Sequence, residues 1–151
     1  MLELEESAKA RGAEILARLD GYGIGREPNP VTQDKSSSGA GMTMAIRECL
    51  TQSASDSSVK WLISGINGEQ NHSYEWGVVN SRLLDRMSGN LQLHHYADTI
   101  GEVGSAMPGI SIGCVVNAFD RGYAPAASAL ICAGDANGLR AALSVSKPEE
   151  Y

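Results

Sequence analysis

Residues 64–77, SGINGEQNHSYEWG, bring together a glycine-rich turn and side chains suited to acid–base chemistry. The apolar run VKWLI precedes them, and in α/β proteins a polar turn at the end of a strand commonly holds the active site. The turn contains no lysine and no cysteine. His72 with Glu69 or Glu75 is one candidate acid–base pair. Capping of the following helix is the favoured interpretation, because polar residues at a helix start are usually caps.

The remaining motifs that resemble chemical sites have simpler explanations. His94 and His95 are adjacent on an expected strand and point to opposite faces, with no Cys or Glu at ligand spacing, so no metal site is expected. The glycine-rich run 21–25 is followed by Arg-Glu-Pro-Asn-Pro, which cannot open the helix of a dinucleotide site. We interpret that run as a turn at a strand end. Residues 35–39 lack the upstream glycine and strand of a P-loop, and no cofactor is expected.

The composition narrows the class of partner. The chain has 151 residues, 42% of them hydrophobic, with a net charge of −6 and no Lys/Arg-rich run, which argues against nucleic acid and anionic membranes. The acidic N-terminus does not resemble a signal peptide, and MPGISIGCVVNAF is too short to span a bilayer. Cys49, Cys114 and Cys132 lie in apolar patterns and are expected to be buried thiols. We expect a single cytoplasmic domain over residues 1–151.

The first half of the chain predicts a helical turn, a strand, a loop and a helix. The strand lies in GAEILARLDGYG, and the loop covers residues 26–39. A helix is predicted at about 38–52, capped by Ser37 or Ser38. One face of that helix carries the apolar residues Met42, Ile46, Cys49 and Leu50.

The second half predicts a strand at VKWLISG and a helix from Ser73 to about Met87, with Glu75 in its first turn. The apolar face of this helix is expected to consist of Trp76, Val79, Leu83 and Met87. The strand LQLHHYA, a glycine-punctuated turn into a helix, and two apolar runs flanking Asp-Ala-Asn-Gly follow. The last of these patterns is typical of a β-hairpin. Strands that alternate with helices and end in a hairpin predict the α/β class with a mixed, largely parallel sheet.

The helix at about Ser105–Phe119 carries almost no charge on any face. A helix that is apolar all round must be buried all round, and a single five-stranded sheet covers only one side. We therefore expect a second copy, another chain or a missing half of the molecule to cover the other side. An irregular, partly buried segment is the alternative, because Gly109 and Gly113 are poor helix formers.

The order of elements from Leu4 to Val145 resembles the C-terminal half of a β-ketoacyl synthase, a thiolase-fold condensing enzyme. The similarity lies in ESAKARGAEILARLDGYG, in the small-residue run and apolar helix from Gly39 to Leu50 with Arg47, and in the hairpin ICAGDANGLRAALSV. The resemblance implies half of a thiolase-like fold.

The catalytic motifs of that family are degenerate here. Counting back from Glu75 places Ser64 at the first family histidine and Gly65 at the glycine that follows it. In the turn Ile100–Met107, Gly101 occupies the position of the second histidine, or Glu102 if the alignment slips by one residue, and the lysine upstream is absent. The residues of these two turns that we expect to contribute to binding are Gly65, Asn67, Glu102 and Gly104.

Decarboxylative condensation needs a thiolate and donors to its oxyanion, and loss of one donor typically costs about a hundredfold or more. The resemblance therefore implies a non-catalytic domain that associates with a ketosynthase-type subunit, or that serves as an adaptor in a bacterial gene cluster. The alternative is the C-terminal portion of an active synthase whose N-terminal half supplies the cysteine. A third interpretation is a module that binds an acyl chain or an acyl-carrier protein without chemistry.

Overall fold

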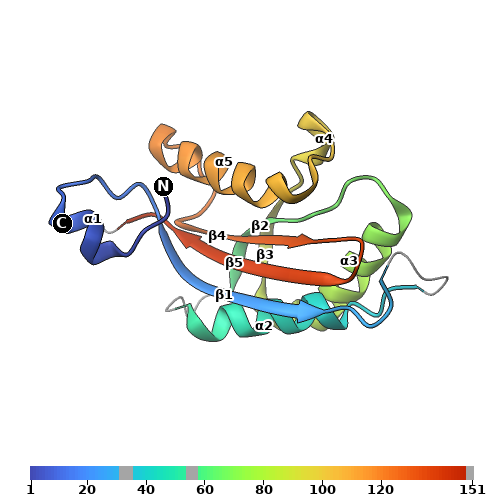
Figure 1. Cartoon of the computed structure of the whole chain (residues 1–151). Coiled ribbons are helices and arrows are strands. Elements are labelled where there is room, and N and C mark those ends of the chain that lie inside the picture. The colour runs from blue at the N-terminus through green and yellow to red at the C-terminus, as the bar shows by residue number, and fades with distance from the viewer. Residues whose placement is uncertain (31–35, 54–57, 149–151) are drawn as a thin grey trace.

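The computed structural model describes residues 1–30, 36–53 and 58–148 and forms three layers around one mixed sheet. The helices α2 and α3 cover one face of the sheet, and α5 lies on the opposite face (Figure 1). In chain order the elements are α1 (Glu5–Ala10), β1 (Arg18–Arg26), α2 (Ala40–Gln52), β2 (Val59–Ile63), α3 (Gln70–Arg82), η1 (Leu84–Arg86), β3 (Met87–His94), α4 (Ala97–Ile100), η2 (Gly104–Ala106), α5 (Met107–Arg121), β4 (Ser128–Gly134) and β5 (Leu139–Ser146).

The sheet has five strands in the order β1-β5-β4-β2-β3. The pairs β4/β2 and β2/β3 are parallel, whereas β5 is antiparallel to both β4 and β1. Four strands therefore run in one direction and only β5 opposes them. The predicted α/β class with a mixed, largely parallel sheet is confirmed, as is the closing hairpin.

Two apolar clusters hold the layers together. One cluster lies between the sheet and α2 and α3 and includes Ile46, Leu62 and Val79, all fully buried. The other lies under α5, where Trp61, Val115 and Phe119 are buried. The predicted apolar face of α2 is confirmed, because Met42, Ile46 and Cys49 are buried and Leu50 packs against them.

Helix α2 lies directly on the backbone of β1. The run 21–25, which we had interpreted as a turn, is instead the middle of this nine-residue strand, so that prediction was wrong. The glycines serve close packing: a Cβ at Gly23 would lie 2.0 Å from the Ala45 carbonyl oxygen, and one at Gly25 would lie 1.9 Å from that of Gly41. No real side chain tolerates such distances, so this strand needs glycine wherever the helix crosses it.

The N-terminus of α2 is capped by a residue distant in sequence. The helix begins at Ala40 after Gly39, not at a serine cap as predicted. The buried carboxylate of Glu27 accepts hydrogen bonds from the backbone N–H of Ser38 at 2.7 Å and of Gly41 at 3.1 Å, and from the Ser38 hydroxyl at 2.7 Å. Burial alone would raise the pKa of Glu27, but these hydrogen bonds outweigh it and the pKa lies below its ordinary value.

Helix α3 begins earlier than predicted. Its first residue is Gln70, and the Ser73 hydroxyl donates to the Glu69 carbonyl at 3.2 Å instead of capping the helix. The helix ends at Arg82, which places Met87 at the start of β3 and not on the helix. Trp76, Val79 and Leu83 are buried as predicted. Ser73 lacks a cap role because the chain turns into the helix one turn earlier.

Replacing Glu27 with Gln should lower the free energy of unfolding at pH 7 by about 1–3 kcal/mol, because one amide oxygen cannot accept from all the donors that converge there. The carboxylate has a lowered pKa in the folded state, so its stabilisation is present above the unfolded-state pKa of about 4.5 and is lost as the pH falls through the folded-state value. Urea unfolding of both proteins between pH 7 and pH 3 measures this difference. The difference in free energy of unfolding between the two proteins should shrink below about pH 4.5. A difference that stays constant with pH would contradict the capping role of the Glu27 carboxylate.

Replacing Gly23 with Ala should lower the free energy of unfolding by about 3 kcal/mol or more, because the added methyl group would clash with the Ala45 carbonyl oxygen. The matched control is Gly77→Ala on the exposed side of α3, where a Cβ meets nothing within 4 Å. Helix propensity predicts that this control gains up to about 1 kcal/mol. Urea unfolding followed by circular dichroism compares the two variants, and equal stability would be inconsistent with close packing of α2 on β1.

Candidate functional site

A cavity of about 320 Å³ lies where the carboxyl ends of β2 and β4 meet the starts of α3, α5 and β5. This edge is where ligand sites of open α/β sheets usually lie. Apolar side chains of Met42, Trp76 and Met107 form part of the wall, and His72, Glu75, Glu102 and Arg140 supply polar groups. The cavity therefore combines an apolar lining with a few charged side chains, as small-molecule sites commonly do.

The four residues expected to contribute to binding lie together. Gly65, Glu102 and Gly104 line the cavity. Asn67 donates to Glu102 through its side-chain amide at 3.3 Å, and the Gly104 N–H donates to the same carboxylate at 2.7 Å. The fold thus joins two turns that are more than thirty residues apart in sequence. Their role in binding stays a prediction.

The two residues that the resemblance aligns with the family's histidines, Ser64 and Gly101, do not line the cavity. Ser64 is buried at the end of β2, where its hydroxyl accepts from the Ile66 N–H at 3.4 Å and its own N–H donates to the His94 carbonyl at 2.9 Å. Gly101 is exposed and adopts φ of +78°, a conformation that favours glycine over histidine. Neither residue lines the cavity, so neither is placed to stabilise an oxyanion there.

Two of the three cysteines are poor nucleophiles. Cys132 lines the cavity, but it is buried, and burial raises the pKa of its thiol well above the ordinary value. Burial also raises the pKa of Cys49 to about 11. The expected burial is confirmed for these two residues, whereas Cys114 is partly exposed. A cysteine in this cavity stays protonated near neutral pH and does not supply a thiolate.

The histidines are engaged in local contacts. His72 Nε2 lies 4.0 Å from a Glu69 oxygen, too far for a hydrogen bond, so that acid–base pair is not formed. His94 accepts from Trp61 Nε1 at 3.1 Å, and His95 lies 2.9 Å from the Asp98 carboxylate. In the described part of the chain, no group of three or more His, Cys, Asp or Glu residues is arranged to hold a metal ion.

A buried ion pair that the sequence analysis missed forms one wall of the cavity. Glu75 lies in the second turn of α3, not the first, and its two oxygens accept from Arg140 Nε at 2.7 Å and Nη2 at 2.8 Å. Their side chains are 5% and 3% exposed, respectively. Hydrogen bonding to Glu75 raises the pKa of Arg140, which also donates to the carbonyls of Asp135 and Leu139. The pair fixes α3 against the hairpin.

A signal for this pair was present in the sequence. Arg140 is the only charged residue in the strand LRAALSVS, and charged residues within a largely buried strand are usually paired. Its partner was not predictable, because sixty-five residues separate the two.

Replacing Arg140 with Met should lower the free energy of unfolding by about 3–5 kcal/mol, since it leaves the Glu75 carboxylate buried without a partner. The double variant Glu75→Met, Arg140→Met removes both charges and should recover most of that loss. Thermal and urea unfolding of the two variants measure the difference. If the double variant is as unstable as the single one, unpaired charge is not the cause.

Comparison with known proteins gives structural matches only. No protein-family model and no curated protein matches the chain. Among solved structures, a complex called AntDE:AntF, a type II PKS acyl-carrier protein with its ketosynthase bound to the hexaketide, matches at a TM-score of 0.83 and 17% identity over 97% of this chain. The ishigamide ketosynthase/chain length factor matches at 0.81 and 15% over 96%. A β-ketoacyl synthase from Burkholderia phymatum matches at 0.76 and 15% over 97%.

The matched region is only part of each solved chain. It covers 42% of the first, 41% of the second and 41% of the third. At these identities the comparison establishes the fold. This chain therefore has the fold of one part of those solved chains and spans about two fifths of their length.

Proposed function

We propose that residues 1–151 are a non-catalytic thiolase-like domain that works in the cytoplasm by associating with another polypeptide. The uncovered side of α5 carries this proposal. Ser111, Val115, Ala118 and Phe119 of this helix are buried against the sheet. On its other side Gly109, Gly113 and Asn117 are exposed at a spacing of four residues. Among the described elements, none lies over the side of α5 that faces away from the sheet (Figure 1).

The uncovered side consists of small and uncharged residues up to the last turn of the helix. The only charged residues of α5 are Asp120 and Arg121 in its last turn. A Cβ built on Gly109 or Gly113 would meet nothing within 4 Å. Exposed glycines inside a helix cost about 1 kcal/mol each relative to alanine, whereas small residues let a second backbone approach closely. A face of this kind is suited to contact with another polypeptide.

The cavity supports the absence of catalysis in this chain alone. Condensation requires a thiolate and oxyanion donors. The cavity offers a protonated Cys132, and Ser64 and Gly101 stand where the resemblance implies the two family histidines. The solved neighbours include a ketosynthase/chain length factor and a ketosynthase in complex with its acyl-carrier protein. By analogy, the partner is a ketosynthase-type subunit. In the other form of this proposal, the chain itself serves as an adaptor in a bacterial gene cluster.

A second candidate is the C-terminal portion of an active β-ketoacyl synthase, favoured by the two-fifths coverage of the solved chains. In that case the covering polypeptide carries a cysteine at a strand-to-helix turn, and the assembled complex condenses acyl thioesters.

The cavity of about 320 Å³ also suits an acyl chain on an acyl-carrier protein. Intact-complex mass after incubation with acyl-CoA or acyl-carrier protein tests for that ligand.

Replacing Gly113 with Leu should stabilise the isolated chain by up to about 1 kcal/mol and weaken association, because the new side chain fills the space a partner needs. Native mass spectrometry of the tagged full-length chain from its own host should show a second, different polypeptide at fixed stoichiometry. That polypeptide should be lost or reduced in Gly113→Leu.

The matched control is Gly77→Leu, which makes the same change on the exposed side of α3. The control should keep the partner. A wild-type chain recovered as a lone, cooperatively folded monomer would contradict the proposal, as would a complex indifferent to Gly113→Leu.

A further inference from the structure

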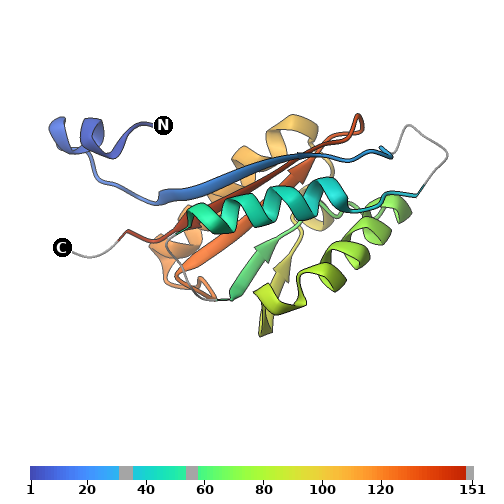
Figure 2. The same cartoon turned by 90° about the horizontal axis from the view of Figure 1, so that it is seen from below.

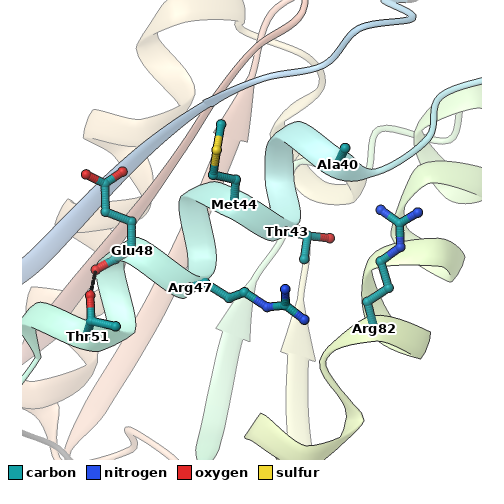
Figure 3. Close-up of a pocket in the computed structure, with 7 residues that line it drawn as sticks. All are labelled: Ala40, Thr43, Met44, Arg47, Glu48, Thr51 and Arg82. Atoms are coloured by element: carbon teal, nitrogen blue, oxygen red, sulfur yellow. Dashed lines mark hydrogen bonds between the residues drawn. The ribbon is translucent and has the colours of Figure 1, made fainter.

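A second surface lies on the opposite side of the sheet from α5. A groove of about 720 Å³ runs between α2 and α3 and is lined by Ala40, Thr43, Met44, Arg47, Glu48, Thr51 and Arg82 (Figure 3). Helices α2 and α3 lie side by side on this face (Figure 2). The groove is distinct from the cavity at the strand ends, since the two share no lining residue.

The lining residues of α2 form one continuous helical stripe. They occupy positions 40, 43, 44, 47, 48 and 51, the spacing with which a helix packs against another helix. At 1.5 Å per residue the stripe is roughly 16 Å long, which matches about three turns of a bound helix. Met44 is 54% exposed in this stripe although methionine is apolar and readily adapts its shape to a partner.

Two arginines give the groove its charge. Arg47 on α2 and Arg82 on α3 are exposed, and their side chains extend into the space between the helices around Thr43 (Figure 3). Across the described residues, no salt bridge or side-chain hydrogen bond involves either guanidinium.

Glu48 does not neutralise the arginines. Its carboxylate points away from them (Figure 3). It accepts a hydrogen bond from the Ile24 N–H of β1 at 3.1 Å. In a chain of net charge −6, an uncompensated positive pair beside an apolar side chain is a local reversal of sign.

We propose that this groove binds an acidic amphipathic helix of a partner protein. Its acidic residues would pair with Arg47 and Arg82 while its apolar face covers Met44, the helix-in-groove mode of recognition. Nucleic acid is disfavoured, because two arginines on an acidic protein neutralise too few phosphates. The proposal goes beyond the association through α5 and is independent of it.

Replacing Met44 with the photo-crosslinker p-benzoylphenylalanine in the full-length chain, expressed in its own host, tests this groove. Irradiation should join the chain to a single peptide of another protein, and mass spectrometry should show that its acidic residues recur at helical spacing. The double variant Arg47→Glu, Arg82→Glu should reduce the crosslink by about tenfold or more, which corresponds to ~1.4 kcal/mol of binding free energy. Changing two acids of that peptide to Arg should restore the crosslink to the charge-reversed chain.

The matched control is Arg26→Glu, a charge reversal at an exposed arginine of β1 that should leave the crosslink unchanged. A crosslink to a second copy of this chain or to nucleic acid would overturn the proposal. So would the absence of any crosslink, or a yield indifferent to Arg47→Glu, Arg82→Glu. Native mass spectrometry of Gly113→Leu tests the contact through α5, and the crosslink from position 44 tests the groove. Either proposal can therefore fail while the other stands.

Discussion

Helix α5 is uncharged up to its last turn, and the single sheet of this chain covers one side of it. Burial of apolar surface is the main favourable term in folding and in most protein association. On the side facing the sheet, Val115 and Phe119 of α5 are buried in one cluster with Trp61 of β2. The other side presents glycines and half-buried apolar residues, so the same helix is both a core element of this fold and its proposed contact with another polypeptide.

The cavity at the strand ends is built by polar contacts between distant parts of the chain. The Glu75–Arg140 pair joins α3 to the hairpin, and Glu102 joins its own turn to Asn67. Within this cavity the thiol of Cys132 stays protonated, and beside it the Ser64 hydroxyl accepts from the Ile66 N–H. Under the proposed function, this cavity keeps its place at the strand ends but has no catalytic role of its own.

The opposite face of the sheet depends on close packing of α2 over β1. Three glycines of β1 allow α2 to lie close to the strand. Glu27, which follows β1, then caps the N-terminus of α2. The outer edge of β1 is also occupied by side chains of this helix, since Gln52 and Glu48 hydrogen-bond to Tyr22 and Ile24. The inner side of α2 is therefore packed against β1. The stripe of α2 that contains Arg47 is the surface that we propose binds a partner.

The order of elements, the mixed sheet, the hairpin and the apolar faces of α2 and α3 were all predictable from the sequence, because local periodicity reports which side of each element is buried. Residues of the two turns around Gly65 and Glu102 were expected to contribute to binding, and the structure brings these turns together. The extent of β1 was not, because glycine lowers strand propensity and only the helix above explains why it is there. The cap at Glu27 and the ion pair of Glu75 with Arg140 were decided by tertiary structure alone: each joins residues whose proximity depends on strand register and helix placement, which local sequence patterns do not encode.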